Sequence, residues 1–259
     1  MATWEISDIH GEARLLERLL MTIKPSFRED ILIFMGDYIN RGPFPMETLR
    51  IVMALKETHP EKVVTLGGNH ENWFLYFLSQ TGSLAPEEER AFLLSMGACR
   101  TFSHFLALKQ EEQVKILDFL INLSMFYENS NTIFSHIPLS PQFNPATDMK
   151  SDSEIHFLDN LPNTYSHISG KLVVAGHKNM RRSGVTLIGE TQNGLLLTDT
   201  GAGMGGSLSA VNLDTIGLKP DIISVNKYRA YKGKLNHILA PSCSNTEHFQ
   251  HSIDFGEGL

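Results

Sequence analysis

The sequence contains few of the features that mark secreted or membrane proteins. Only two of its 259 residues are cysteines, and Cys99 and Cys243 form no CxxC pair and are too few for a disulfide framework. No apolar run approaches the roughly 18 residues that a membrane-spanning helix needs. The first residues show no basic segment followed by an apolar one. We therefore expect a cytoplasmic protein with no membrane partner.

Positive charge is also scarce. Lysine and arginine together number 22 against 29 aspartates and glutamates, which gives a formal net charge of −7. This balance argues against nucleic-acid binding through bulk positive charge, so an anionic substrate would need a local cluster of cations. Internal repeats and low-complexity stretches are lacking, and 42% of the residues are hydrophobic. We expect one domain over residues 1–259 with a large buried core.

Short apolar runs alternate with helical patterns along the chain. Leucines at helical spacing predict helices at 12–23 and 46–57. The shorter strands after Gly184 predict a second sheet, and the alternation as a whole indicates an α/β fold. A helical stretch of about 71–123 interrupts the strands as an insertion, with helices at 71–79, 86–96 (ending before Gly97) and 110–123. Buried strands are predicted at 4–6, 31–35, 63–66, 132–134, 172–175, 195–198 and 208–213.

Side chains that bind metal ions follow the first five predicted strands. In open α/β sheets, ligands bind outside the carboxyl ends of the strands, so these positions should converge on one crevice. Residues two apart at a strand end point the same way, so the first two can share one ion. The set is Asp8, His10, Asp37, Asn69, His136 and His177.

This set of donors favours a centre of two divalent metal ions. It contains no sulfur, which excludes the usual closed thiolate zinc site and suits Mn²⁺, Fe or Zn²⁺. Six donors are enough for two ions, which in two-metal sites lie about 3.5–4 Å apart and activate a water molecule. Asp37 is the candidate for the carboxylate that bridges them.

Two side chains next to these ligands can act on a phosphate group. Arg41 follows Asp37 by four residues and precedes Gly42, so its guanidinium can reach the crevice and clamp phosphate oxygens. His70 is adjacent to Asn69 and can donate a proton to the leaving oxygen, a role worth about 10²–10⁴ in rate.

These motifs together resemble the calcineurin-like metallophosphoesterases, and among them the phosphoprotein phosphatase branch with its bacterial and phage serine/threonine phosphatases. The resemblance covers residues 6 to about 213 and leaves a C-terminal extension of about 214–259. It implies two mixed sheets packed as a sandwich and flanked by helices, with two divalent ions, Mn²⁺ as the first expectation. The matching segments are Asp8-Ile9-His10-Gly11, Gly36-Asp37-Tyr38-Ile39-Asn40-Arg41-Gly42, Gly68-Asn69-His70-Glu71, Ser135-His136, Gly176-His177 and Asp199-Thr200-Gly201 with Gly205-Gly206.

The resemblance also implies a role for each motif residue. A hydroxide that bridges the two ions would attack the phosphorus, with Arg41 and Asn69 on the phosphate and His70 as the acid beside Asn40. Asp8, His10 and Asp37 would hold one ion, and Asp37, Asn69, His136 and His177 the other.

Three departures from the family pattern stand out. Asn40 occupies the position of the usual aspartate, and an amide can accept the same hydrogen bond from His70 but cannot stabilise an imidazolium by charge. The turn after His136 is Ile137-Pro138.

The third departure is that residues 137–176 contain no arginine where the family has its second phosphate-binding one. Arg181 and Arg182 are the candidate replacements, with Arg100 as a further one. Arg181 and Arg182 follow His177 closely, so they form either a basic edge over the site or a solvated turn.

The sequence predicts a phosphomonoesterase, foremost a protein phosphatase that acts on phosphorylated serine, threonine or tyrosine. Its partner would be a phosphorylated protein or peptide, or a small phosphoester. The Asp199-Thr200-Gly201 and Gly205-Gly206 pattern keeps a dinucleoside polyphosphate hydrolase as an alternative. Asn40 and the missing arginine leave open a third possibility, that the protein is a catalytically weak metal-binding module used for protein interaction.

Overall fold

Two five-stranded sheets form the centre of the molecule. A computed structural model describes residues 1–80, 86–143, 157–158, 160–215 and 221–226. The first sheet has the order β10-β9-β1-β2-β3, with β1, β2 and β3 parallel and β9 and β10 antiparallel. Its strands are β1 (Thr3–Ile6), β2 (Ile31–Phe34), β3 (Val63–Thr65), β9 (Ser207–Asn212) and β10 (Asp221–Asn226).

The second sheet has the order β4-β5-β6-β8-β7. Its three central strands are parallel, and an antiparallel strand closes each edge. Every residue of the central strands is buried, which explains why they read as unbroken apolar runs rather than alternating ones. The strands are β4 (Phe126–Glu128), β5 (Thr132–Ser135), β6 (Leu172–Ala175), β7 (Thr186–Ile188) and β8 (Leu195–Leu197).

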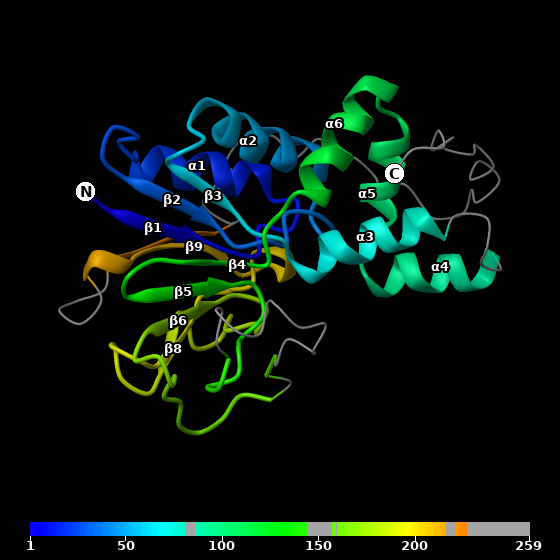
Figure 1. Ribbon diagram of the computed structural model, residues 1–259. Coiled ribbons are helices and arrows are strands. Elements are labelled where there is room, and N and C mark those ends of the chain that lie inside the picture. Colours follow the sequence, from blue (N-terminus) through cyan, green and yellow to red (C-terminus); the bar gives the residue numbers. More distant parts are fainter. Residues whose placement is uncertain (81–85, 144–156, 159, 216–220, 227–259) are drawn as a thin grey trace.

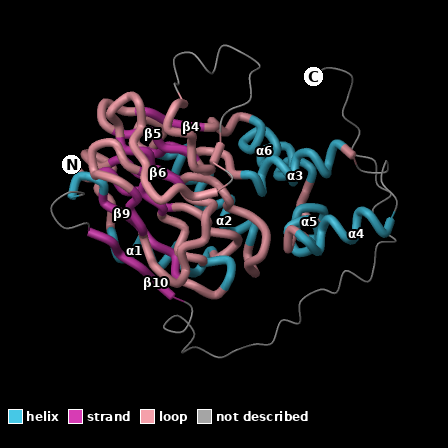
Figure 2. The backbone as a smooth tube through the Cα atoms, turned by 90° about the horizontal axis from the view of Figure 1, so that it is seen from below, coloured by secondary structure: helices cyan, strands magenta, loops and turns pink. Residues whose placement is uncertain are grey.

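Helices cover the first sheet and extend to one side of it. The helices α1 (Ala13–Ile23) and α2 (Pro45–Thr58) lie over its outer face (Figure 1). A group of four helices projects beyond the end of both sheets, as Figure 2 shows from below. They are α3 (Asn69–Ser79), α4 (Pro86–Ser95), α5 (Cys99–Leu106) and α6 (Gln110–Ile121). Short 3₁₀ turns, η1 (Ala202–Met204) and η2 (Leu213–Thr215), flank β9.

The apolar core is divided by the sheets. Between the two sheets, side chains from both pack together, among them Met35, Phe134 and Val211. The outer face of the first sheet packs against α1, α2 and the four-helix group, whose Phe102 and Phe105 are fully enclosed. Burial of this kind, at about 25 cal/mol per Å² of apolar surface, is the main stabilising contribution.

The order of the predicted elements is confirmed, and the differences have physical causes. The helix α4 starts at Pro86 and ends at Ser95, with Gly97 in the left-handed region at φ +62° as the expected stop. The predicted strand at 208–213 is wrong as a member of the second sheet, because β9 pairs with β1 in the first. Its partner is some 200 residues away in the sequence, so no local pattern specifies it.

Two expectations reach beyond the residues that the structure describes. The single domain over 1–259 stays a prediction, as does the C-terminal extension, of which β10 is described. Among the described residues, no helix is both long enough and apolar enough to cross a membrane.

Candidate metal centre

The loops after the parallel strands carry unusually strained residues. Outside glycine, a positive φ is uncommon and costs on the order of 1–3 kcal/mol, and such residues persist where the surroundings fix them, often at functional sites. Among the described residues, Lys24 is the one non-glycine example away from these loops. The others are Asp8 (55°), His10 (49°), Asp37 (53°), Asn40 (68°), Arg41 (62°) and His177 (60°).

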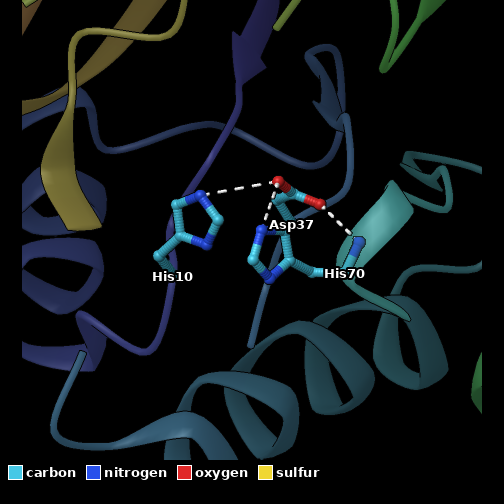
Figure 3. A group of neighbouring side chains, drawn as sticks. All are labelled: His10, Asp37 and His70. Carbon is cyan, nitrogen blue, oxygen red and sulfur yellow. Dashed lines mark hydrogen bonds and ion pairs between the residues drawn. The ribbon is translucent and has the colours of Figure 1, made fainter. Parts of the chain in front are cut away.

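Asp37 lies between two groups of side chains that could each hold a metal ion. Its Oδ2 is 3.4 Å from His10 Nε2 and 3.9 Å from His70 Nε2 (Figure 3). Its Oδ1 is 3.3 Å from His136 Nε2 and accepts a hydrogen bond from the His70 backbone N–H at 3.0 Å. One group is His10, Asp37 and His70, and the other is Asp37, His136 and His177, with the ligand atoms of each within 4.8 Å of one another.

Asn69 completes the second group. Its Oδ1 lies 3.0 Å from His136 Nε2 and 2.8 Å from His177 Nδ1, so three predicted ligands of one ion converge. His136 Nδ1 donates to the Met35 carbonyl at 2.8 Å, which fixes the ring and turns Nε2 toward Asp37. Asn69 stands here because it is the first residue of α3, directly after β3 and its glycine turn.

Asp8 has a looser place in the first group than the sequence predicts. Its Oδ1 is 3.8 Å from His10 Nε2, and its Oδ2 accepts hydrogen bonds from the Ser7 hydroxyl and the His177 backbone N–H. The compact group around Asp37 contains His70 in its stead. The Asp8 carboxylate is 1% exposed, and its Oδ1 has no hydrogen-bond partner among the described residues. A buried carboxylate oxygen without a partner is costly, and a cation at this point would satisfy it.

Two of the three ligand histidines have the protonation that metal binding requires. Burial lowers the pKa of His10 to about 4 and that of His177 to about 4, so both are neutral near pH 7, as a ligand nitrogen must be. Burial would also lower the pKa of His136, but the Asp37 carboxylate beside it raises that pKa to about 10, so this ring is protonated near pH 7 and would release its proton on binding a metal ion. Burial would raise the pKa of Asp37, but the charge of His136 holds it well below its usual range. The oxygen and nitrogen donors at this edge therefore fit divalent ions.

Arg41 and Asn40 bracket His70. Arg41 Nη1 donates to His10 Nε2 at 3.0 Å, and its Nη2 donates to His70 Nε2 at 3.2 Å. Since His70 Nε2 accepts, a neutral ring carries its proton on Nδ1, which lies 2.7 Å from the side-chain amide of Asn40. That hydrogen bond requires the amide oxygen to face the ring, an orientation reached by a half-turn of the amide that leaves its shape unchanged.

The other candidate arginines lie farther out. Arg181 is exposed, and its Nη1 donates to the Met204 carbonyl at 2.6 Å. The turn to which it is bonded packs against His10, since a Cβ on Gly203 would lie 2.6 Å from His10 Cβ. Arg181 is therefore linked to the site through this turn, and its described contacts include no ligand side chain. Arg182 is exposed, and Arg100 is half-buried on α5.

Glu71 is a residue of this site whose role the sequence did not reveal. Its buried carboxylate accepts backbone N–H bonds from Gly68 at 2.9 Å, Asp37 at 2.8 Å, Tyr38 at 2.9 Å and Ile39 at 3.3 Å. It thereby fixes the loop that carries Asp37 to the start of α3. Its place in Gly68-Asn69-His70-Glu71, three residues after the residue that caps the helix, was the available signal.

Trp73 was not singled out either. Its ring lies one helical turn after His70 on α3, with the ring centroids 4.9 Å apart. The half-buried indole forms a wall beside His70.

A family model described as calcineurin-like phosphoesterase matches residues 1–192. The chain belongs to this family. The fold described above, two mixed five-stranded sheets with flanking helices, is that of a metallophosphoesterase, as the resemblance implied. Members of this family generally use two metal ions, and among the residues that the structure describes, the two His and Asp groups around Asp37 could hold them.

Individual members of the calcineurin-like phosphoesterase family are similar over parts of the chain. A symmetrical bis(5'-nucleosyl)-tetraphosphatase of Vibrio parahaemolyticus is 30% identical over 60% of this chain and 51% of its own. Serine/threonine-protein phosphatase PP1-1 of Saccharomyces cerevisiae is 42% identical over 66 residues, 25% of this chain and 21% of its own. The chain thus spans about half or less of the length of these relatives.

A solved structure supports the same fold. A protein serine/threonine phosphatase from Saccharomyces cerevisiae with similarity to human phosphatase PP5 superposes with a TM-score of 0.60 at 14% identity. The match covers 88% of this chain and 80% of that one.

Proposed function

We propose that this protein is a phosphatase that needs two divalent metal ions, Mn²⁺ first among them, and releases phosphate from phosphorylated side chains of proteins or peptides. The observation that carries the proposal is the position of Asp37, whose two carboxylate oxygens face two separate groups of ligand side chains. Asp8, His10 and Asp37 would hold one ion and Asp37, Asn69, His136 and His177 the other. When bound, such ions supply the Lewis acidity that activates a water and withdraws charge from a phosphoryl group.

The side chains next to the ligands have complementary tasks. The Arg41 guanidinium, at the rim beside His10 and His70, would bind phosphate oxygens in exchange for its bonds to the two imidazoles. Burial, opposed by the Asp37 carboxylate, lowers the pKa of His70 to about 3, so this ring is neutral near pH 7 without substrate. The negative charges of a bound phosphomonoester would favour the protonated form of His70, and the protonated ring can donate a proton to the leaving oxygen.

A second candidate activity is the hydrolysis of dinucleoside polyphosphates. It is favoured by the tetraphosphatase relative, whose similarity extends over 60% of this chain, more than twice the share covered by the PP1-1 match. The same metal ligands and the same arginine would serve a phosphoanhydride, so the site residues do not separate the two substrate classes. Arg181 and Arg182, beyond His177, would bind the additional phosphates of the longer substrate.

A panel of substrates tests the proposal. Purified protein is assayed with a tyrosine phosphopeptide, a serine or threonine phosphopeptide and diadenosine tetraphosphate, each with Mn²⁺ and with a chelator. We expect phosphate release from a phosphopeptide that requires the metal. Turnover confined to diadenosine tetraphosphate would transfer the assignment to the second candidate. Metal binding without turnover of any substrate would indicate a metal-binding interaction module. Full activity in a verified metal-free preparation would rule out the metal mechanism.

The amide at position 40 gives a further testable property. A carboxylate in place of Asn40 would face His70 Nδ1 and favour the imidazolium, so Asn40→Asp should raise the pKa of His70. A raised pKa keeps the acid protonated to higher pH. We therefore expect the alkaline limb of the rate profile for an alkyl phosphate to move up by about one pH unit, and less for an aryl phosphate with a good leaving group.

The control for Asn40→Asp is the double variant with His70→Ala. It should show no shift, because the proton carrier is gone. Aspartate tolerates the left-handed backbone at this position nearly as well as asparagine, so misfolding should not confuse the comparison. Identical profiles for Asn40→Asp and the unmodified protein would remove His70 from the role of acid.

A further inference from the structure

The backbone at Asn40 and Arg41 is held in place from outside its own loop. Both residues have left-handed backbones, at φ +68° and +62°, and the side chains of both contact His70. Adjacent non-glycine residues in this region relax to other conformations unless neighbouring groups fix them. The positions of the guanidinium and the amide therefore depend on whatever holds these two peptide units.

The four-helix group accepts the hydrogen bonds of both N–H groups. The carbonyls of the same two peptide units bond elsewhere, Ile39 O to His10 Nδ1 at 3.0 Å and Asn40 O to the Gly42 N–H at 2.7 Å. The Asn40 N–H donates to the hydroxyl of Thr101 at 3.0 Å, and the Arg41 N–H donates to the Gly97 carbonyl at 2.9 Å. Thr101 lies in the first turn of α5 and is fully buried. Gly97 lies in the turn between α4 and α5, so both partners come from one short segment some 60 residues away in the sequence from the loop that they bind.

The turn itself is rigidly placed. Its Ala98 N–H donates to the Leu93 carbonyl at 2.8 Å, which closes the end of α4. The next helix is anchored by Phe102, which contacts Phe74 of α3 with ring centroids 4.7 Å apart. A turn fixed in this way can impose its geometry on Asn40 and Arg41.

Gly97 also forms the surface on which the arginine side chain lies. It has a left-handed backbone at φ +62°, and a Cβ added to it would be 3.2 Å from Arg41 Cγ. Such a contact is tighter than an ordinary van der Waals contact, so any side chain here would push the Arg41 stem away. The close approach is thus possible because residue 97 lacks a side chain.

We infer that Thr101 and Gly97 are positioning residues, through which the helical group sets where Arg41 and Asn40 stand relative to His70. The functional part of this inference rests on the proposed phosphatase function, while the backbone contacts do not. The helices therefore serve as a support for the phosphate-binding arginine.

The first test compares two variants of Thr101. Thr101→Val keeps the shape of the side chain and removes the acceptor, whereas Thr101→Ser keeps the acceptor. In Thr101→Val we expect hydrogen exchange of the Asn40 amide to rise about tenfold and kcat/KM for p-nitrophenyl phosphate to fall about tenfold, as the loss of one hydrogen bond predicts. Thr101→Ser should keep both values. Unchanged exchange in a folded Thr101→Val would overturn the inference for Thr101.

The second test uses two glycines with the same strain and different surroundings. Gly97 and the exposed Gly170 have similar left-handed backbones, at +62° and +70°, but a Cβ on Gly170 meets nothing within 4 Å. Both Gly97→Ala and Gly170→Ala add left-handed backbone strain, and Gly97→Ala alone also adds the contact with Arg41. We expect Gly97→Ala alone to raise KM for p-nitrophenyl phosphate, and the inhibition constant of inorganic phosphate, about fivefold or more, with kcat less affected. Equal kinetics in the two variants would overturn the inference for Gly97.

The two ideas fail in different ways. If the unmodified protein hydrolyses no phosphoester, the proposed function is wrong, and the amide exchange of Asn40 and Arg41 still decides whether the helical group holds them. If hydrolysis is present but neither Thr101→Val nor Gly97→Ala differs from its control, the helices do not position the arginine.

Discussion

Asp37→Asn should remove both bound metal ions and lower kcat/KM by roughly a thousandfold or more, since one side chain faces both ligand groups. The amide replaces a charged oxygen donor with a neutral group, one end of which is an N–H₂ that a cation repels. Asparagine is well suited to the left-handed backbone of this position, so the loop should keep its shape. Metal content by mass spectrometry and turnover of p-nitrophenyl phosphate measure the two losses.

The matched control is Asp118→Asn on the exposed side of α6, which should keep metal and activity. A second consequence concerns His136, whose pKa is raised by the Asp37 carboxylate. In the variant that pKa should fall, so His136 should lose its proton at a lower pH, as NMR titration of metal-free protein can show. Two tightly bound ions in Asp37→Asn would place this carboxylate outside the metal centre.

Arg41→Ala should weaken substrate binding and leave the metal content as it is. The residue is exposed overall, although its guanidinium contacts His10 and His70, so solvent screens part of its attraction for a phosphate. We expect a loss in kcat/KM of about 2 kcal/mol, or roughly 30-fold, at the low end of what a desolvated ion pair provides. Arg41→Lys should recover part of it, because an ammonium keeps the charge without the two-pronged geometry.

Arg28→Ala serves as the control for the change in net charge, since this exposed arginine precedes β2 whereas Asp37 follows the other end of that strand. Arg181→Ala provides the comparison within the site, since this arginine is bonded to the Met204 carbonyl. A larger loss in Arg181→Ala than in Arg41→Ala would make Arg181 the main phosphate-binding residue. Kinetics of Arg41→Ala equal to those of the unmodified protein would show that Arg41 does not touch the substrate.

The sequence by itself determined the parallel strands, the order of the ligand residues and the class of chemistry. These features are local: a buried strand is an apolar run of a few residues, and each ligand follows its strand directly. The stop of α4 at Gly97 was readable for the same reason, because a helix end depends on the few residues around it. The expected convergence of Asp37, Asn69, His136 and His177 is present, but the rule for the strand ends of one open sheet does not account for it. Asp37 and Asn69 follow β2 and β3 of the first sheet, whereas His136 and His177 follow β5 and β6 of the second, so the packing of the two sheets brings them together.

The tertiary structure decided everything that depends on partners distant in sequence. The edge strands β4 and β7 have three residues each and are partly exposed, so their formation depends on pairing with β5 and β8 and not on a pattern of their own. Packing likewise places β9 beside β1. It also brings His70, and not Asp8, into the compact group around Asp37. The hold of Thr101 and Gly97 on the Asn40–Arg41 backbone is of the same kind. A hydrogen bond between residues 60 positions apart leaves no periodic trace in the sequence, because it is made only after the helices have packed.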